Sequence, residues 1–368
     1  MANNHNYYTS MKINGILQQT LRYDQATFSV NVIDQRLLPH EFKHLELTEL
    51  SDFCQAISEM VVRGAPLIGI TAAFGLALSI RTSVKHVESA YKALLATRPT
   101  AINLKWALDA IMVAITENPD NPFLAAIDKA KRMLQNDIHC CEAIGEAGVT
   151  LIKSISDSKN GPVNILTHCN AGWLATIDWG TALAPIYKAD AAGIDLHVWV
   201  DETRPRNQGA SLTAWELYQQ GIPHTLISDN TGGHLMQEGL VDLCLVGTDR
   251  TAANGDVCNK IGTYLKALAA KDNSIPFYVA LPSSTIDWQL QQGVGNIPIE
   301  LRDPEEITHI EGLSSSGKRQ TICINSQSKA VNYGFDVTPA RLISGLITEF
   351  GIYEANTQHL AELKELLT

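Results

Sequence analysis

A cysteine and an aspartate each follow a short apolar run in this chain, and together they could transfer protons on a small molecule. Cys169 comes after the run 163–166 and stands in residues 167–172 (THCNAG). Asp249 stands likewise in residues 247–250 (GTDR), after a second apolar run. If both runs are strands of one parallel sheet, the thiol and the carboxylic acid meet at its carboxyl edge, where ligands bind.

The thiol of Cys169 has two interpretations. A free cysteine is most often a small buried hydrophobe. The position of Cys169 at a strand end, before a small-residue turn that we expect to open a helix, instead favours a reactive thiol, because helix N–H groups stabilise a thiolate. The other six cysteines lack such a turn, and we expect them to be structural. We also expect a structural role for His168, because neighbouring strand residues point to opposite faces.

Asp249 also has an ordinary interpretation, as a loop aspartate that caps the following segment. The apolar run before it and the Asn-, Gly- and Asp-rich segment 250–262 after it favour a pocket instead. A carboxylic acid in a dry pocket has a raised pKa and can donate a proton near neutral pH. Asp249 is therefore a candidate general acid.

Residues 63–66 (RGAP) are a candidate anion site. Pro66 suits the first turn of a helix, and the free N–H groups there, at Gly64 and Ala65 beside the Arg63 guanidinium, would bind an anion. The alternative interpretation, simple punctuation of the helix, is equally compatible with these residues.

Two later segments carry further groups suited to a sugar phosphate. The loop 202–210 (ETRPRNQGA) offers arginines and the amide of Gln208, or it is a solvated turn. Lys260 follows Asn259, and we expect it to open a helix at another strand end, where it could reach a phosphate. Most such lysines are merely exposed.

The composition excludes several classes of protein. Lys and Arg number 28 against 39 Asp and Glu, and a formal net charge of −11 argues against a nucleic-acid-binding surface. The first residues are polar and no apolar run reaches the about 20 residues that span a bilayer, so we expect no membrane association. Seven cysteines without paired spacing indicate a reducing cytoplasm. Without metal-binding motifs, a Walker A loop or a complete dinucleotide fingerprint, we expect no metal and no cofactor.

The periodicity of apolar residues divides the chain into two domains. A smaller domain of strands and helices is expected at residues 1–135, with a strand at 28–33 and helices from about 47 and at 66–80, 84–96, 103–116 and 122–156. In residues 136–368, helical patterns such as 211–220 and 260–270 alternate with β-rich runs at 163–167, 196–200, 224–228, 243–246 and 277–280. This alternation predicts a Rossmann-like, doubly wound α/β domain with a parallel sheet. Residues 304–329 are expected to be a surface loop with a short strand at 321–324.

Taken together, these segments resemble the methylthioribose-1-phosphate isomerases of methionine salvage. The resemblance covers most of the chain and is carried by residues 34–35 (DQ), 63–69 (RGAPLIG), 98–104 (RPTAINL), 167–172, 202–210, 247–264 and 282–287 (PSSTID). It implies that Cys169 and Asp249 are the catalytic pair. It implies that the sugar phosphate is held by Arg63, Ala65, Arg98, Gln208, Asn259 and Lys260. A Rossmann-like domain after a smaller N-terminal domain, a homodimer and the absence of a cofactor are implied as well.

The expected reaction is the aldose–ketose isomerisation of 5-methylthioribose 1-phosphate to 5-methylthioribulose 1-phosphate. A phosphate on the anomeric oxygen blocks ring opening to a free aldehyde, so Asp249 would assist cleavage at the ring oxygen as a general acid. Cys169 would remove the hydrogen at carbon 2 as a thiolate base. A direct hydride shift between carbons 2 and 1 is the competing route.

Some residues depart from the family pattern, and alternatives remain. Trp173 stands where a small residue is usual and is expected to alter the pocket, while Thr248, Cys258 and Leu301 also depart. The substrate could therefore be 5-deoxyribose 1-phosphate or ribose 1,5-bisphosphate. An alternative of another class is a non-catalytic regulatory subunit like those of the exchange factor for translation initiation factor two. A nucleotide-binding regulatory module has only the fold in its favour.

Overall fold

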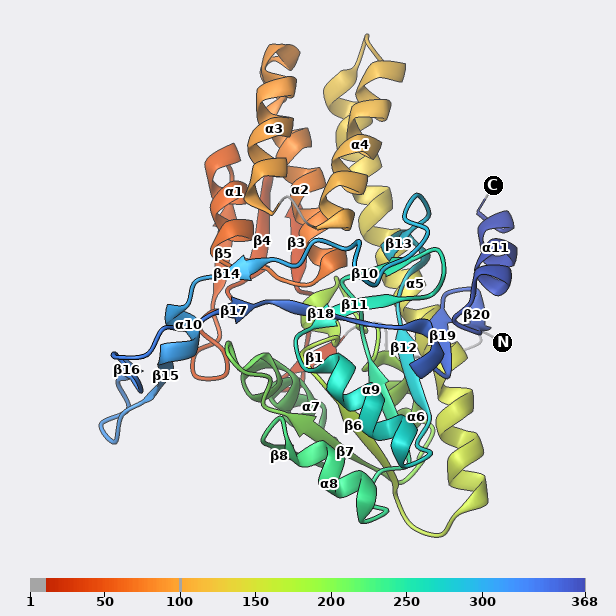
Figure 1. Cartoon of the computed structure of the whole chain (residues 1–368). Coiled ribbons are helices and arrows are strands. Elements are labelled where there is room, and N and C mark those ends of the chain that lie inside the picture. Colours follow the sequence, from red (N-terminus) through yellow and green to blue (C-terminus); the bar gives the residue numbers. More distant parts are fainter. Residues whose placement is uncertain (1–10, 99–100, 368) are drawn as a thin grey trace, which may run out of the picture.

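The N-terminal part of the chain packs helices against a small antiparallel sheet (Figure 1). The structure, a computed structural model, describes residues 11–98 and 101–367, so Pro99 and Thr100 of the segment 98–104 lie outside it. The strands of this sheet are β3 (Leu21–Asp24), β4 (Ser29–Ile33) and β5 (His44–Leu47), while β1 (Met11–Ile13) and β2 (Ile16–Gln18) form a separate pair. The helices are α1 (Leu50–Ser58), α2 (Ala65–Ser79), η1 (Val84–His86), α3 (Val87–Thr97), α4 (Ile102–Glu117) and α5 (Pro122–Ser158).

Helix α2 is the centre of this part. It is apolar on nearly every side, a pattern that requires burial all round. The helices α1, α3, α4 and α5 contact it and supply that burial. Its first turn is thereby held in place from several directions.

Helix α5 runs unbroken for 37 residues and joins the two parts of the molecule. Its first half contributes Ala126 and Met133 to the N-terminal core, and its second half contributes Cys141 and Ile152 to the core under the main sheet. The predicted boundary between residues 135 and 136 falls inside this helix. The division into two domains stays a prediction.

The larger part is built on a seven-stranded sheet, in the described residues, with the order β20-β19-β12-β9-β6-β7-β8. Its strands are β6 (Val163–Thr167), β7 (Leu196–Asp201), β8 (His224–Ile227), β9 (Leu243–Val246), β12 (Phe277–Ala280), β19 (Gly345–Thr348) and β20 (Gly351–Tyr353). All neighbours are parallel except β19 and β20. The predicted parallel, doubly wound α/β fold is confirmed.

Helices cover both faces of this sheet, so its central strands β6, β9, β12 and β19 are largely buried, while the edge strands β8 and β20 are more exposed. The segments between the strands form η2 (Trp173–Ala175), α6 (Ala184–Ala191), η3 (Gly209–Thr213), α7 (Ala214–Gln220), α8 (Thr231–Gln237), α9 (Thr263–Asp272) and, last in the chain, α11 (Thr357–Glu365). The neighbours Ile165 and Leu166 of β6 point into two different cores. Among residues 11–98 and 101–367, no helix combines the length and the apolar content that crossing a membrane requires.

A second sheet, which no pattern in the sequence predicted, lies at the carboxyl edge of the first. Its order is β13-β10-β11-β18, formed by β10 (Arg250–Ala252), β11 (Val257–Lys260), β13 (Ile286–Asp287) and β18 (Phe335–Thr338). The expectation that Lys260 opens a helix is wrong. Lys260 ends β11, where it is paired with Phe335, and α9 begins only at Thr263.

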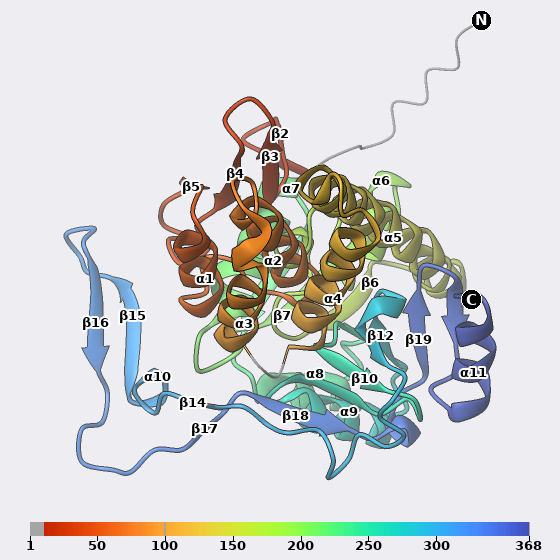
Figure 2. The same cartoon turned by 90° about the horizontal axis from the view of Figure 1, so that it is seen from above.

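The expected surface loop at residues 304–329 is largely a β-hairpin. After η4 (Ser283–Thr285), β14 (Leu301–Arg302) and α10 (Glu305–Thr308), the strands β15 (His309–Leu313) and β16 (Arg319–Cys323) pair with each other. Figure 2 shows this hairpin reaching away from the body of the molecule. The chain then returns through β17 (Asn332–Tyr333), β18 and η5 (Ala340–Leu342). The short strand expected at 321–324 corresponds to the end of β16.

The close contact between α2 and the segment after β6 depends on Gly64. Gly64 precedes the first turn of α2 with φ +94°, a conformation that favours glycine. A Cβ atom here would lie 2.5 Å from the carbonyl oxygen of Ala175 in η2. Only a residue without a side chain lets the two segments approach in this way.

We expect Gly64→Ala to lower the free energy of unfolding by roughly 1–3 kcal/mol, because both the backbone conformation and the Ala175 carbonyl oppose a side chain. Urea unfolding followed by circular dichroism measures the change. Gly233→Ala in α8 is the matched control, since its Cβ would meet only the Cβ of Ala269 at 3.6 Å. Equal stability of the two variants would contradict this role of Gly64.

Candidate active site

Cys169 lies directly after β6 and is held through its backbone. Cys169 is buried, with 7% of its surface exposed, and its backbone φ angle is +66°. Its N–H donates to Thr203 Oγ1 at 2.9 Å, and its carbonyl oxygen accepts from Thr213 Oγ1 at 2.6 Å. Two hydroxyl groups from the neighbouring loop and helix therefore determine where the thiol points.

We expected a helix directly after the turn that carries Cys169, and within the described residues none begins there. The chain forms only the short 3₁₀ turn η2 before α6 begins at Ala184. The thiol consequently lacks the helix N-terminus that was expected to favour a thiolate. Arg63 and Lys260 lower the pKa of the thiol instead, but burial outweighs them and this pKa stays above its usual value.

Asp249 lies where the main sheet passes into the second sheet, between the end of β9 and the start of β10. Its N–H donates to the carbonyl oxygen of Cys258 at 3.0 Å, which fixes it against β11. Burial raises the pKa of its carboxyl group, and Glu300 raises it further, against the opposing charges of Lys260, Arg98 and Arg63. The raised pKa expected for this acid is confirmed.

The thiol, the carboxyl group and a buried ammonium group act on one another. Burial raises the pKa of the Cys169 thiol, Arg63 and Lys260 lower it, and Asp249 raises it. Burial lowers the pKa of Lys260, while Cys169 and Asp249 raise it. Such mutual effects require the groups to lie within electrostatic reach. The structure therefore brings the two sequence-predicted catalytic residues together, around Lys260.

The three sequence-predicted cations surround this pair from different elements. The Arg63 guanidinium donates to the side-chain and main-chain oxygens of Asn170, the latter at 2.8 Å. Arg98 donates from Nη2 to Glu300 Oε2 at 3.1 Å, and its Nε has no partner in the described part of the chain. Lys260 Nζ donates to the Gly334 carbonyl oxygen at 3.0 Å and lies 4.9 Å from the centre of the Phe335 ring.

The remaining predicted binding residues differ from one another in their contacts. Gln208 is buried, and its Oε1 has no partner within the described residues. Asn259 Nδ2 donates to Thr263 Oγ1 at 3.0 Å, and as the strand neighbour of Lys260 it points to the other face of β11. Gly64 and Ala65 are buried at the start of α2.

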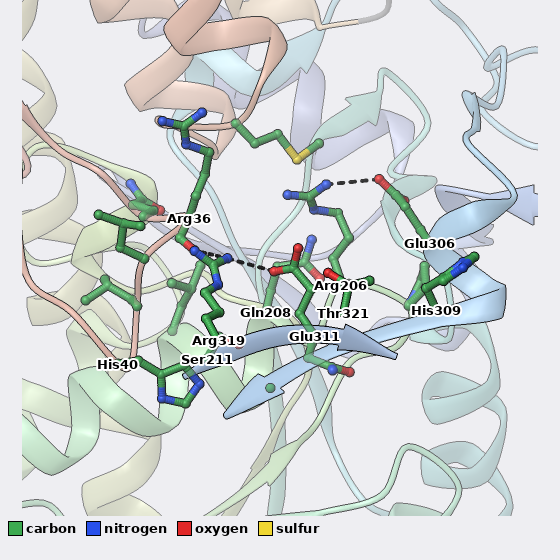
Figure 3. A pocket seen from close by; sticks show the side chains of 18 of the residues that line it. Arg36, His40, Arg206, Gln208, Ser211, Glu306, His309, Glu311, Arg319 and Thr321 are labelled. Carbon is green, nitrogen blue, oxygen red and sulfur yellow. Dashed lines mark hydrogen bonds and ion pairs between the residues drawn. The ribbon is translucent and has the colours of Figure 1, made fainter. Parts of the chain in front are cut away.

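Two cavities border the site. The larger, of about 1020 Å³, is lined by Arg63 and Gln208 and by the hairpin β15–β16 (Figure 3). The other arginines that Figure 3 labels on its wall are paired with carboxylates, such as Arg206 with Glu306 at 3.0 Å and Arg319 with Glu311 at 2.7 Å. Arg63 differs from these arginines because its guanidinium donates to Asn170 in the Cys169 turn.

The smaller cavity, of about 30 Å³, lies at Asp249 and Arg98. Its other lining residues are mostly apolar: Ala65, Ile68, Ala101, Cys258, Ile297, Pro298 and Phe335, with Arg250. Trp173 lines neither cavity, contrary to the expectation that it would alter the pocket. It is fully buried and packs against Trp215 with ring centres 6.2 Å apart.

Sequence reasoning missed several groups of the site. Glu300 accepts from Arg98 and, at 2.7 Å, from Arg302, and it acts electrostatically on Asp249. Thr203 and Thr213 hold the Cys169 backbone, as described above. None of these residues carries a local signal, because each acquires its role from a partner far away in the chain.

His168, Asp201 and Asp229 bring together atoms that could hold a metal ion. His168 Nδ1 lies 2.8 Å from Asp201 Oδ2, and its Nε2 lies 2.8 Å from the carbonyl oxygen of Ile261. The ammonium group of Lys266 lies 3.0 Å from the same Asp201 oxygen. The carboxylate of Asp229 accepts from the N–H groups of Thr203 and Arg204, each at 2.7 Å. These contacts already use the atoms that would bind a metal ion, and the expected absence of a metal stays a prediction.

Comparison with known proteins identifies relatives along the whole chain. Residues 61–355 match the initiation factor 2 subunit family. The methylthioribose-1-phosphate isomerase of Paramagnetospirillum magneticum is 58% identical over 96% of this chain and 99% of its own length. The protein of that name from Methylorubrum extorquens is 56% identical over 96% of this chain and 98% of its own length.

Solved structures agree with this assignment. The 5-methylthioribose 1-phosphate isomerase from Pyrococcus horikoshii has a TM-score of 0.84 and 37% identity, with all of both chains covered. The translation initiation factor eIF-2B subunit delta from A. fulgidus has a TM-score of 0.75 and 34% identity, over 94% of this chain and 99% of that chain.

We expect Asp249→Asn to lower the pKa of the Cys169 thiol, because it removes a negative charge that raises this pKa. Lys260→Met removes a positive charge and should raise the same pKa. The pH dependence of iodoacetamide labelling, followed by mass spectrometry of the Cys169 peptide, measures both shifts. Asp120→Asn, at an exposed position, is the control. If Asp249→Asn left the labelling profile as unchanged as this control does, the thiol and the carboxyl group would not share a site.

Proposed function

This chain belongs to the initiation factor 2 subunit family, and from that membership and the site we propose that it is a methylthioribose-1-phosphate isomerase, acting in methionine salvage. It converts 5-methylthioribose 1-phosphate to 5-methylthioribulose 1-phosphate, with Cys169 and Asp249 as the catalytic pair. The observation that carries the proposal is the mutual electrostatic effect of a buried thiol, a carboxyl group and Lys260. A non-catalytic subunit has no need to bury these three groups together.

The sugar phosphate is bound by cations and by unpaired polar groups. Arg63, Arg98 and Lys260 act electrostatically on Asp249, so a phosphate near them would meet three positive charges. Within the described residues the Nε of Arg98 has no partner, which makes it a donor suited to phosphate oxygens. The N–H groups of Gly64 and Ala65 are suited as well, because the first N–H groups of a helix have no partner inside it. The unpartnered Oε1 of Gln208 can accept from a sugar hydroxyl. Asn259 remains in this binding set on the family resemblance.

The lining of the smaller cavity favours a methylthio group as the 5-substituent. Ile68, Ala101, Ile297 and Phe335 form an apolar wall beside Asp249. A thioether gains from contact with such a wall. A second phosphate would lose its hydration there, and the two cations of the same lining, Arg98 and Arg250, already face Glu300 and Asp287. The substrate is therefore the sugar with the apolar 5-substituent.

Cys169 and Asp249 supply the proton transfers that the isomerisation needs. Asp249 gives its proton to the ring oxygen as the bond from that oxygen to carbon 1 breaks, and Cys169 takes the hydrogen from carbon 2 as a proton. The electron pair left behind forms the double bond between carbons 1 and 2. Cys169 then returns a proton to carbon 1, and the hydroxyl on carbon 2 gives its proton to Asp249 as the ketone forms. Arg63 and Lys260 support this route because they lower the pKa of the Cys169 thiol, which burial, the largest effect, raises above its usual value.

The proposed setting is the cytoplasm, and the proposed assembly is a homodimer. All seven cysteines are free thiols, which suits a reducing compartment. The homodimer rests on the family resemblance.

Purified protein should isomerise 5-methylthioribose 1-phosphate with the highest kcat/KM among the three candidate sugars. We expect 5-deoxyribose 1-phosphate to lose roughly 10–200-fold, because it gives up apolar contacts in the small cavity. Ribose 1,5-bisphosphate should be a still poorer substrate because its second phosphate would be desolvated. Product formation is followed by NMR. Turnover of none of these sugars would contradict the proposal and would favour a regulatory subunit.

Asp249→Asn should reduce kcat by about 10²–10⁴-fold, the loss typical of a missing general acid. Cys169→Ser should reduce kcat as well. A serine hydroxyl is a far weaker acid than a thiol, so very little of it is deprotonated and able to act as a base. The control is Asp120→Asn, which should keep wild-type kcat. Near-normal turnover by Cys169→Ser would remove the thiol from the mechanism.

The same assay in heavy water separates the two routes for the hydrogen at carbon 2. Deuterium from the solvent at carbon 1 of the product supports the thiolate base. Its complete absence supports the direct hydride shift.

A further inference from the structure

A buried carboxylate outside the catalytic pair holds the segment that carries the thiol. Glu216 lies on α7 with no exposed surface. Its Oε1 accepts from Asn170 Nδ2 at 2.8 Å and from the N–H of Leu174 at 3.0 Å. Its Oε2 accepts from the N–H of Trp173 at 2.9 Å and from the Tyr187 hydroxyl at 2.8 Å. Three of these four donors belong to the turn that follows Cys169.

Asn170 transmits this arrangement to the proposed phosphate site. While its Nδ2 donates to Glu216, its side-chain and main-chain oxygens both accept from the Arg63 guanidinium. The same Nδ2 also donates to Thr213 Oγ1 at 3.2 Å, and that hydroxyl donates to the Cys169 carbonyl oxygen. Through hydrogen bonds, the carboxylate is thus linked to Arg63 by Asn170, and to the Cys169 carbonyl oxygen by Asn170 and Thr213.

The turn after Cys169 packs closely against the Glu216 carboxylate. A Cβ atom on Gly172 would lie 1.8 Å from Glu216 Oε2, so the turn must carry glycine at this position. The carboxylate replaces the helix N-terminus that is missing after β6, because it gathers the N–H groups of the turn that a following helix would have ordered.

We propose that Glu216, in its ionised form, is a positioning residue of the isomerase reaction: it aims Arg63 through Asn170 and holds the Cys169 turn in the reactive geometry. This inference rests on the proposed function of the site. Glu216 does not touch the reacting atoms, and it acts only through the groups that donate to it. A protonated carboxyl group would have to give up one acceptor position, so at least one of the four hydrogen bonds would be lost.

The protonation of Glu216 falls in a measurable range of pH. Burial raises its pKa to about 7, while the hydrogen bonds from Asn170, Tyr187 and Leu174 and the charge of Arg63 lower it. The charged and titratable groups that face it are Arg63 and Tyr187, and Asp178 acts in turn on Tyr187. As the pH falls through this value the carboxylate becomes protonated, and the positioning is lost.

Glu216→Gln keeps the side-chain volume but turns an amide N–H₂ group toward groups that donate to Glu216 in the wild type. We therefore expect kcat/KM to fall by about 10–100-fold, the loss typical when a residue that orients a site is replaced. The ionisation near the pKa of about 7 should disappear from the acid side of its pH profile. Tyr187→Phe is the matched variant. It removes one donor that lowers the pKa of Glu216, so it should shift this ionisation to higher pH and keep most of the alkaline rate. An acid limb at the same pH in all three proteins would overturn the proposal.

Hydrogen exchange provides a readout that does not depend on turnover. The amides of Trp173 and Leu174 should exchange faster in Glu216→Gln than in the wild type, while peptides from β6 and β9 keep their protection. If the wild type turns over none of the sugars, the proposed function fails, and the exchange result still decides the positioning role. Unchanged exchange at Trp173 and Leu174 would overturn that role, even in an active enzyme.

Discussion

The desolvation of three ionisable groups in one place is the constraint on which this structure depends. Taking a thiol, a carboxyl group and an ammonium group out of water is unfavourable for each charged form, and their mutual interaction offsets part of that penalty. Lys260 lies at the centre, because it favours the charged forms of both Cys169 and Asp249. The penalty can be offset only when all three residues are held close together. The strands that carry them must therefore be positioned with the accuracy of a packed core.

Three separate elements meet to satisfy this constraint. The main sheet supplies Cys169 at the end of β6, the second sheet supplies Lys260 at the end of β11, and α2 closes the site from the N-terminal part. Asp249 lies on the connection between the two sheets. Gly64 lets α2 approach the backbone of Ala175 closely enough to place Arg63 near the thiol. The site therefore exists only in the assembled fold, and none of these elements contains it alone.

Sequence patterns predicted the main sheet well and the second sheet not at all. The strands β6, β9 and β12 have the predicted bounds, because each is a continuous apolar run between turn residues and is buried on both faces. The strands β10, β13 and β18 have two to four residues, and β11 pairs with β18, which lies more than seventy residues further along the chain. So short a strand shows no periodicity. The sequence predicts a loop where the hairpin β15–β16 lies. Both faces of the hairpin are largely exposed, so its residues do not alternate between apolar and polar.

The sequence by itself determined which chemical groups this protein has available: a thiol and a carboxylic acid at strand ends, and cations in segments typical of one family. Only the tertiary structure decided how those groups behave. It replaced the expected helix after Cys169 by a turn held by Glu216, moved Lys260 from a helix to a strand end, and placed Trp173 in the core instead of the pocket. The physical reason is that a pKa and a hydrogen bond depend on burial and on distances between atoms. Those quantities are set by residues far apart in the chain, and no local pattern contains them.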